Sequence, residues 1–512
     1  MDLSTLAGMS EAERIASLTA TFQENGQPIY AASFVARSAQ QHPEALALIC
    51  EQQKLTYGEL ARRVNHVTKL LREKGIKPRD KVIIIFENSI EFYIAYYGAW
   101  QAGAVVAPVN TFLAERELKH IVHDAQPAAI VGNSSIIEAY RSLAQVILTE
   151  EDMQAEYAGE VAIDVLEPDE LSVLLYTSGT TGFPKGVMFC SRGIVTSVIQ
   201  GIARLEPGAD ERVFGLLPLF HSFAQNACIW SPMMLGVTVI VVPKIERRNI
   251  LEGLTHQPTI FLGVPALYGL LCVMRNINFD TVRYFMCGSD ALPDKIRAYF
   301  ELIYRRKLCN GYGLTEAGPT IALSVSDELV SASCVGKPVT GMACEIRDEN
   351  NQPLPTGQVG VLFVKGVNVM LGYYQAPEMT QEVLRDGWLN TGDFAFLDGA
   401  DRLHIVGRAK DLIKHKGINI YPPEVENVIM SHPQVTMAAV VGKASPDVGE
   451  IPIAFVTLRT TAPGIEAELK ALCLQQLAGY KVPRQFIILE ALPMTALGKV
   501  DKKRLRAEFL HD

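Results

Sequence analysis

The sequence lacks an excess of positive charge and lacks paired cysteines. It holds 47 lysines and arginines against 56 aspartates and glutamates, a net charge of −9, which argues against a general nucleic-acid binder. Its nine cysteines are dispersed and include no Cys-x-x-Cys pair. An odd, scattered set is typical of reduced thiols, so we predict neither a disulfide framework nor a zinc site and expect a cytoplasmic location.

The sequence also lacks a long hydrophobic run. Its most apolar stretch, residues 228–243, is short and contains Ser231, Pro232 and Gly236. We therefore predict a buried helix or strand there and no transmembrane segment. The first residues carry both acidic and basic side chains and no apolar core, so no signal peptide is predicted. These features leave open a peripheral contact with a membrane.

The length and the order of the hydrophobic segments indicate an α/β fold. A chain of 512 residues exceeds one ordinary core, so two or more domains are expected. Residues 45–50, 81–86 and 104–109 read as short apolar strands separated by helical segments. This alternation predicts a parallel sheet covered on both faces. Residues 1–30 are expected to form a loosely packed leader.

Residues 176–186 (Tyr-Thr-Ser-Gly-Thr-Thr-Gly-Phe-Pro-Lys-Gly) follow an apolar run and predict a phosphate-binding loop. Glycines let backbone N–H groups approach an anion, hydroxyls donate hydrogen bonds, and Lys185 adds a positive charge. The spacing differs from a Walker A loop, because only two residues separate Gly179 from Gly182 and a glycine follows the lysine. The predicted phosphate-binding residues are Thr177, Ser178, Gly179, Thr180, Thr181, Gly182 and Lys185.

Five further segments place polar residues beside glycines or prolines. They are residues 216–225 (with His221), 310–318 (Asn-Gly-Tyr-Gly-Leu-Thr-Glu-Ala-Gly), 386–393 (ending in Asp393), 407–417 and 492–500 (with Gly498-Lys499). Together with residues 176–186 they resemble, in order, the motifs of the adenylate-forming superfamily, which includes acyl-CoA synthetases, peptide-synthetase adenylation domains and luciferases. Residues 287–293 match only in part, because Ser289 and Asp290 replace small residues of that family.

The resemblance covers nearly the whole chain and implies its domain organisation. It implies a large N-terminal domain over residues 1–409, with two parallel-rich αβ sheets and a small β-barrel subdomain. A small, mobile α+β domain over residues 410–512 would follow, with a hinge near Lys410. Rotation of the small domain would let one site serve two steps.

The resemblance also assigns roles around a bound ATP. Tyr312 would offer a flat face to adenine, Asp393 and Arg408 would bind the ribose, and Lys499 would be the adenylation lysine. Glu316 and Thr180 would bind Mg²⁺, which prefers one or two carboxylates plus phosphate oxygens. The further residues implied at the nucleotide or catalytic site are Thr181, Lys185, His221, Ser289, Asp290, Asn310, Gly311, Gly313, Thr315, Lys414 and Gly417.

The acyl-binding residues implied by the resemblance carry no charge beyond the histidine. They are His221, Phe223, Ala224, Gly263 and Val264. Relatives that adenylate amino acids place an aspartate just after the residue that matches Phe220. Here His221 and Ser222 follow instead, so an amino-acid substrate is disfavoured because its buried ammonium would lack a partner. The apolar wall likewise favours an aliphatic or aromatic acid over a diacid.

The resemblance implies that the chain activates a carboxylic acid with ATP and passes the acyl group to a thiol. Our first choice is a medium- or long-chain fatty acid with coenzyme A as acceptor. Acyl carrier protein, whose phosphopantetheine ends in the same thiol, is the alternative. A luciferase shares these motifs, and a catalytically silent acyl-adenylate sensor is the candidate from another class. The sequence leaves monomer and homodimer both open.

Overall fold

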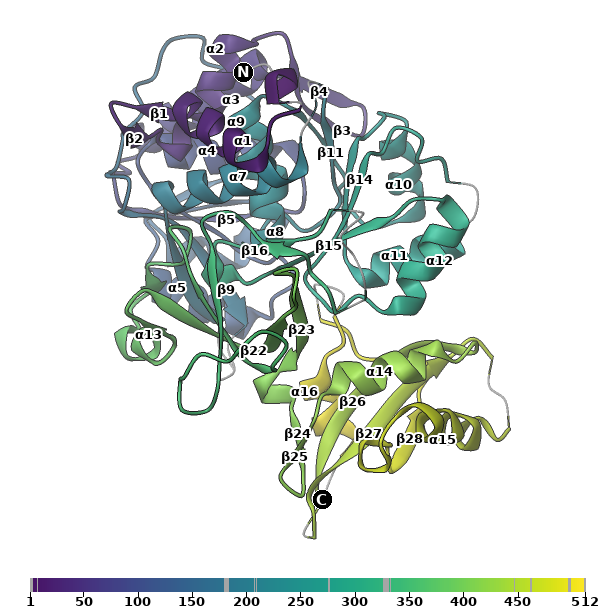
Figure 1. The fold of residues 1–512 in the computed structure, drawn as a ribbon. Helices are drawn as coiled ribbons and strands as arrows, with labels where there is room; N and C mark the ends of the chain where they lie inside the picture. Colours follow the sequence, from purple (N-terminus) through teal and green to yellow (C-terminus); the bar gives the residue numbers. More distant parts are fainter. Residues whose placement is uncertain are drawn as a thin grey trace.

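The computed structural model describes residues 3–6, 8–178, 184–206, 208, 210–274, 277–325, 331, 333–445, 447–460, 463–495 and 499–510. Figure 1 shows a large lobe built from the N-terminal four-fifths of the chain and a small lobe of C-terminal residues beneath it. No described helix is both long and apolar enough to cross a membrane. The apolar stretch at residues 228–243 instead contributes to a π-helix, a short helix and a strand, all largely buried.

The first large sheet has seven strands in the order β20-β10-β9-β6-β5-β7-β8. The pairs among β5, β6, β7, β8 and β9 are parallel, whereas β10 runs antiparallel to both β9 and β20. The predicted phosphate loop therefore joins two antiparallel neighbours. The strands are β5 (Lys81–Ile85), β6 (Val105–Pro108), β7 (Ala129–Gly132), β8 (Val146–Leu148), β9 (Leu171–Ser178), β10 (Pro184–Cys190) and β20 (Gly372–Tyr373).

The second large sheet has nine strands in the order β17-β16-β15-β14-β13-β11-β12-β3-β4. Its six central strands are parallel, and its outer strands are antiparallel. The predicted strand at residues 45–50 lies here rather than beside β5. The strands are β3 (Leu46–Cys50), β4 (Gln53–Thr56), β11 (Arg212–Gly215), β12 (Thr238–Val241), β13 (Ile260–Gly263), β14 (Tyr284–Cys287), β15 (Leu308–Gly313), β16 (Thr320–Leu323) and β17 (Lys337–Pro338).

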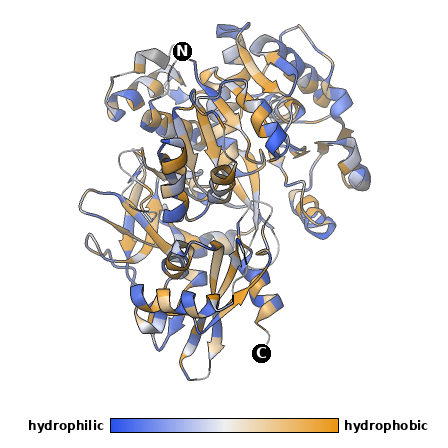
Figure 2. Ribbon diagram, turned by 90° about the vertical axis from the view of Figure 1, so that its right-hand side faces the viewer, coloured by the Kyte–Doolittle hydropathy of each residue, from blue (hydrophilic) through white to orange (hydrophobic). Residues whose placement is uncertain are grey.

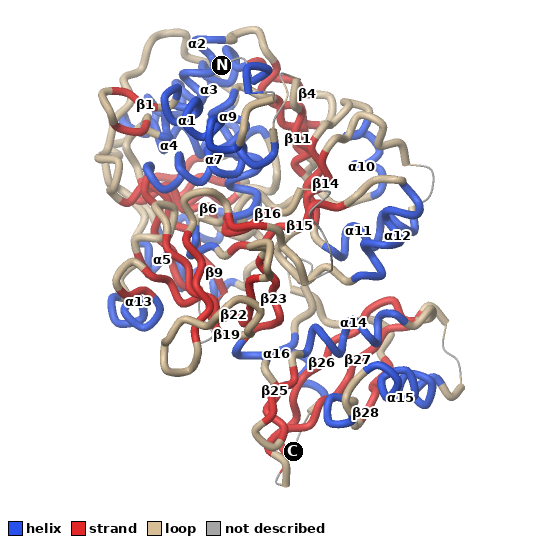
Figure 3. Tube along the Cα trace, in the orientation of Figure 1, coloured by secondary structure: helices blue, strands red, loops and turns tan. Residues whose placement is uncertain are grey.

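Helices cover these two sheets, as the colouring by secondary structure makes plain (Figure 3). Helices α10, α11 and α12 lie along one side of the second sheet. The main helices of the large lobe are α1 (Glu11–Thr21), α2 (Phe34–Gln41), α3 (Tyr57–Glu73), α4 (Ile90–Gln101), α5 (Glu115–Ala125), α7 (Ser191–Leu205), α8 (Ser222–Ala224), α9 (Ser231–Leu235), α10 (Arg247–Leu254), α11 (Pro265–Val273), α12 (Asp294–Tyr304) and α13 (Pro377–Val383).

An antiparallel five-stranded sheet completes the large lobe at the position of the expected subdomain. Its strands are β18 (Ala343–Arg347), β19 (Gly360–Lys365), β21 (Leu384–Arg385), β22 (Trp388–Leu397) and β23 (Leu403–Arg408); β20 and α13 lie between β19 and β21 in the chain. The pairing of β22 with β23 sets Asp393 opposite Arg408. Two residues that are distant in the sequence thereby become neighbours.

The small lobe is an α+β unit, as expected. A mixed sheet pairs β25-β24-β27-β26, with β28 parallel to β27. Its strands are β24 (Ile413–His415), β25 (Ile418–Ile420), β26 (Val435–Ser445), β27 (Gly449–Leu458) and β28 (Gln485–Ile488), and its helices are α14 (Pro422–Ser431), α15 (Ile465–Gln476) and α16 (Lys502–Phe509).

The core of the large lobe is centred on α4, which is apolar on every side and almost entirely buried. A helix of this composition is stable only when other elements surround it. The polar ends of its aromatic side chains find partners: Trp100 Nε1 donates to Ser172 Oγ at 2.6 Å, and Tyr93 Oη donates to the Cys228 carbonyl at 3.0 Å. Figure 2 shows the apolar residues gathered on the strands and inner helices.

The expectation that residues 1–30 form a loosely packed leader is wrong for the helix in this segment. Residues 11–21 form α1, which packs against α7. The buried Arg14 guanidinium donates to the carbonyls of Ala203 at 2.6 Å and Met9 at 2.5 Å, and it pairs with Glu206. Local sequence could not reveal these partners, because two of them lie almost two hundred residues away.

We expect Gly98→Ala to lower thermal stability. Gly98 lies in α4 where α3 crosses it, and an added Cβ would lie 2.6 Å from Cγ1 of Val67, so the helices would have to separate. Overpacking of this kind costs about 1–3 kcal/mol, measurable by thermal unfolding. The control is Gly201→Ala in α7, where a Cβ meets nothing within 4 Å and the change should be neutral or stabilising by about 0.5–1 kcal/mol. Equal effects would contradict this packing.

Candidate active site

A large cleft lies between the two lobes and brings together residues from all the sequence motifs. Parallel strands β11, β13, β14 and β15 end at one edge of the second sheet, where open α/β sheets form ligand crevices. The small lobe closes over this edge and adds its own side chains. The predicted residues that line the cleft are Thr177, Lys185, His221, Ser289, Asp290, Asn310, Gly311, Tyr312, Gly313, Thr315, Glu316, Asp393, Arg408 and Lys499.

Tyr312, Asp393 and Arg408 form one polar group on the wall of the cleft. Tyr312 Oη donates a hydrogen bond of 2.6 Å to Asp393 Oδ2, and Arg408 Nε lies 3.7 Å from Asp393 Oδ1. Burial raises the pKa of Asp393, while Arg408, the Tyr312 bond and two lysines oppose that rise. The result is a fixed carboxylate beside an aromatic ring, a pair that can accept from vicinal hydroxyls and face a flat base.

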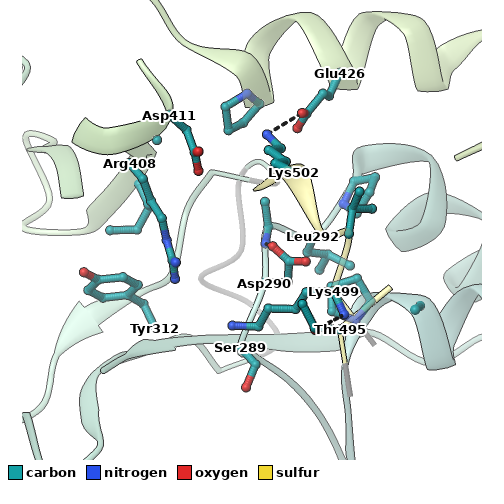
Figure 4. A pocket seen from close by; sticks show the side chains of 18 of the residues that line it. Ser289, Asp290, Leu292, Tyr312, Arg408, Asp411, Glu426, Thr495, Lys499 and Lys502 are labelled. Atoms are coloured by element: carbon teal, nitrogen blue, oxygen red, sulfur yellow. Dashed lines mark hydrogen bonds and ion pairs between the residues drawn. The ribbon is translucent and has the colours of Figure 1, made fainter. Parts of the chain in front are cut away.

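Lys499 enters the cleft from the small lobe. The Thr495 backbone N–H donates to the Lys499 carbonyl at 2.7 Å, the Lys499 backbone N–H donates to Thr495 Oγ1 at 3.3 Å, and Met494 forms a β-bridge with Val500. Figure 4 shows the Lys499 side chain extended across the cleft beside Ser289 and Asp290 and pointing toward the side of Tyr312. Burial lowers the pKa of Lys499, as does Arg408, whereas Asp290 and Asp393 act in the opposite direction.

Lys185 and Glu316 of the large lobe both contact Tyr373. Lys185 Nζ lies 5.1 Å from the centre of the Tyr373 ring, and Tyr373 Oη donates a 2.9 Å hydrogen bond to Glu316 Oε1. Within the described part of the chain, Glu316 Oε2 has no hydrogen-bond donor, so it is available to a ligand. No group of three or more His, Cys, Asp or Glu among the described residues forms a ready-made metal site. One carboxylate plus phosphate oxygens is nevertheless a set that suits Mg²⁺.

His221 caps the short helix α8 and faces the cleft as a neutral ring. Its Nδ1 accepts from the Phe223 backbone N–H at 3.3 Å, which leaves the proton on Nε2. Burial and the neighbouring Lys499 lower its pKa to about 3. The imidazole therefore serves as a hydrogen-bond donor rather than as a cation near neutral pH. Next to it, Ser222 Oγ and Thr315 Oγ1 share a 2.9 Å hydrogen bond that joins two of the motifs.

Several predicted residues lie away from the cleft surface. Phe223, Ala224, Gly263 and Val264 do not line it, and the Phe223 ring lies against Gly288, where an added Cβ would lie 3.5 Å from the ring. Lys414 is exposed on β24, and Gly417 turns the chain between β24 and β25 with a φ of +77°. Neither of these two lines the cleft. Gly179, Thr180, Thr181 and Gly182 lie outside the described residues, and Ser178 ends β9.

Sequence reasoning missed Tyr373 and Ser222 as members of the site. Tyr373 lies in a Gly-Tyr-Tyr segment that reads as an ordinary turn. Its role emerges only because β20 pairs with β10, the strand that carries Lys185. The local sequence offers one sign of this role: Tyr373 directly follows Gly372 in a segment of apolar and aromatic residues.

Comparisons with known proteins agree with this geometry. A model of the AMP-binding enzyme family matches residues 35–374, and a model of the AMP-binding enzyme C-terminal domain matches residues 424–499. The chain is 32% identical over 490 residues to a feruloyl-CoA synthase from Amycolatopsis sp., covering 93% of this chain and 98% of that protein. It is 30% identical over 526 residues to a long-chain-fatty-acid–CoA ligase from Bacillus subtilis (strain 168), covering 93% and 94%.

Two solved structures of one relative resemble this chain over nearly its whole length. ATP-bound MatB from Rhodopseudomonas palustris is 29% identical, covers 93% of this chain and 98% of its own, and has a TM-score of 0.87. Apo MatB has the same identity and coverage but a TM-score of 0.78. The TM-score is thus higher for the ATP-bound form. The chain belongs to the AMP-binding enzyme family of the adenylate-forming superfamily, the superfamily of the acid–CoA ligases.

Proposed function

We propose that the protein activates a medium- or long-chain fatty acid with ATP and transfers the acyl group to coenzyme A. The observation that carries this proposal is the position of Lys499. A lysine of the small lobe lies in the same cleft as Lys185, Tyr312 and Asp393 of the large lobe. Such a convergence suits a polyphosphate and a carboxylate that must be held together.

In the first step a carboxylate oxygen attacks the α-phosphorus of ATP. The bond to the β-phosphate oxygen breaks, pyrophosphate leaves with the electron pair, and an acyl-adenylate forms. Lys499 and Lys185 offset negative charge around the α-phosphorus, and neutral His221 donates a hydrogen bond toward the carboxylate end. Asp393 and Arg408 hold the ribose, while the ring of Tyr312 faces adenine.

Glu316 is the residue that would hold Mg²⁺, with Thr180 as its predicted neighbour in the phosphate loop. The ion, when bound with the nucleotide, neutralises phosphate charge and orients the leaving group. The Tyr373 hydroxyl donates a hydrogen bond to Glu316 Oε1 and thereby orients the carboxylate.

In the second step the thiol sulfur attacks the acyl carbon, the bond to the AMP oxygen breaks, and the thioester and AMP are released. Lys499 occupies the space that the thiol needs. The small domain, residues 410–512, therefore rotates about Lys410 relative to residues 1–409. Rotation withdraws Lys499 and brings the segment with Lys414 and Gly417 toward the cleft.

The choice of acid rests on the residues behind His221. Phe223, Ala224, Gly263 and Val264 are uncharged but do not line the cleft; the adjoining residues Pro265, Ala266 and Leu270 of α11 do line it and are also uncharged. Aromatic acids are the second candidate, because the feruloyl-CoA synthase that resembles this chain acts on one such acid by its name. Acyl carrier protein is the alternative acceptor, and the CoA-dependent names of the relatives favour coenzyme A.

The test of this proposal is carboxylate-dependent exchange of labelled pyrophosphate into ATP. We expect exchange with fatty acids, and we expect thioester masses when coenzyme A is added to a panel of fatty and arylpropenoic acids of increasing length. Exchange with arylpropenoic acids alone would replace the fatty acid by the second candidate. Nucleotide binding without exchange for any acid would contradict the proposal and identify a catalytically silent sensor.

Replacing Lys499 should separate the two steps. We expect Lys499→Ala to lower the rate of acyl-adenylate formation by about 10²- to 10³-fold, the loss typical of one transition-state charge contact. Formation of thioester from supplied acyl-adenylate and coenzyme A should be nearly unchanged, because Lys499 is withdrawn in that step. Equal losses in both steps would be inconsistent with a lysine used only once per cycle.

The Tyr373 hydroxyl should affect the use of magnesium-bound ATP. Tyr373→Phe keeps the ring near Lys185 but removes the hydrogen bond to Glu316, a charge-assisted bond worth about 1.5–3 kcal/mol. We expect the Mg²⁺ concentration for half-maximal exchange to rise roughly tenfold or more. The matched control is Tyr374→Phe, since the neighbouring hydroxyl makes no hydrogen bond among the described residues. A similar response of both variants would exclude this role for Tyr373.

A further inference from the structure

Helix α14 of the small lobe contacts both the Lys499-bearing tail and the large lobe. Two adjacent residues of α14 make these contacts: Glu426 contacts the tail, and Asn427 contacts the large lobe. Glu426 pairs with Lys502 of the tail, and Asn427 pairs with Asp294 of α12. Helix α14 is thus the element through which the tail is held in register with the large lobe.

The tail side of this connection begins three residues after Lys499. Lys502 Nζ lies 2.6 Å from Glu426 Oε1, and that carboxylate also accepts from the Val440 backbone N–H at 2.7 Å. The Asp501 side chain caps α16 by accepting from Arg504 N at 2.9 Å. A dashed line in Figure 4 marks the ion pair between Glu426 and Lys502, in the same view as Lys499.

The large-lobe side is made of polar contacts from the first turn of α12. The Asp294 backbone N–H donates to Asn427 Oδ1 at 3.2 Å, and Asn427 Nδ2 donates back to Asp294 Oδ2 at 3.1 Å. Lys295 Nζ donates to the carbonyl oxygens of His432 at 2.7 Å and Val435 at 2.8 Å. We refer to Asp294, Lys295 and Asn427 with these two carbonyls as the interlobe latch.

Of the two carbonyls that Lys295 binds, that of His432 lies at the C-cap of α14, and that of Val435 belongs to the first residue of β26. Carbonyls at a helix C-terminus lack intrahelical partners and carry the negative end of the helix dipole. Burial lowers the pKa of Lys295, and the nearby Arg459 guanidinium acts in the same direction. The two carbonyls therefore compensate an ammonium that is half-buried and close to a like charge. These bonds exist only while α12 and α14 face each other.

We propose that Lys295 and Asn427 are positioning residues for acid activation: the interlobe latch holds α14 on α12 and thereby keeps Lys499 in the cleft. This inference rests on the proposed two-step function. Rotation of the small domain would separate the latch residues, so the latch favours the first step over the second. Contacts of this polar kind suit an interface that opens and closes in every cycle.

The test compares Lys295→Met and Asn427→Ala with the unmodified protein in each half reaction. Lys295→Met removes the ammonium and keeps the length of the side chain. We expect each variant to slow acid-dependent pyrophosphate exchange about tenfold, the effect of losing a hydrogen bond to a charged or partly buried group. Thioester formation from supplied acyl-adenylate should stay the same or become faster. The control is Lys470→Met on α15, an exposed lysine outside the cleft, which should change neither step.

A shift in lobe arrangement is the second readout. A pair of fluorophores on the two lobes should report less of the closed arrangement in both latch variants, while thermal unfolding midpoints stay near that of the unmodified protein. Equal slowing of both half reactions, or no slowing of exchange, would overturn the latch. An unmodified protein that shows no exchange would instead contradict the proposed function, so the two failures are distinguishable.

Discussion

The site depends on holding one ammonium group, that of Lys499, inside a cleft that belongs mostly to the other lobe. Removing a cation from water is unfavourable, and burial accordingly lowers the pKa of Lys499. The carboxylates of Asp290 and Asp393 compensate in part. With Lys185 and Arg408 also lining the cleft, the site is arranged for an anion that supplies the remaining negative charge. A polyphosphate bound beside a carboxylate is such an anion.

The large lobe supplies most of the residues that line the cleft, and the small lobe adds Lys499. Parallel strands of the large lobe present Tyr312, Ser289 and His221 at one edge, and the antiparallel sheet adds Asp393 opposite Arg408. These groups are fixed by extensive burial of the strands behind them. Lys499 instead sits on a short tail whose position depends on polar contacts of α14. The proposed two-step reaction requires a nucleotide site held by the large lobe and a lysine that the small lobe can withdraw.

Much of the fold and of the site could be predicted from local sequence. The apolar strands at β3, β5 and β6 were placed correctly, because parallel strands buried on both faces read as continuous apolar runs. Site residues such as Tyr312 and His221 were assigned through the resemblance to the adenylate-forming superfamily, and both line the cleft. Which sheet each strand joins could not be predicted, and β3 lies apart from β5 because pairing depends on tertiary packing.

Contacts between distant segments set the limit of prediction. Arg14 lies in the segment expected to be a loose leader, yet it is buried and contacts Ala203 of α7 and Glu206. Tyr373 gained its role from the pairing of β20 with β10, and Lys295 from the approach of another lobe. Phe223 was expected in the acyl-binding site but does not line the cleft. It lies in α8, two positions after His221, which does line the cleft. In each case the direction of the side chain was decided by neighbours that the local pattern does not encode.

A crystal structure with a non-hydrolysable acyl-adenylate analogue would show directly whether Lys499 of the small lobe and the residues of the large lobe bind one nucleotide. We expect the purine to lie against Tyr312, the ribose hydroxyls on Asp393, and the phosphate mimic between Lys185 and Lys499, with the lobes arranged as here. An analogue bound away from these residues, or bound among them with Lys499 outside the cleft in the enzyme poised for activation, would contradict this expectation.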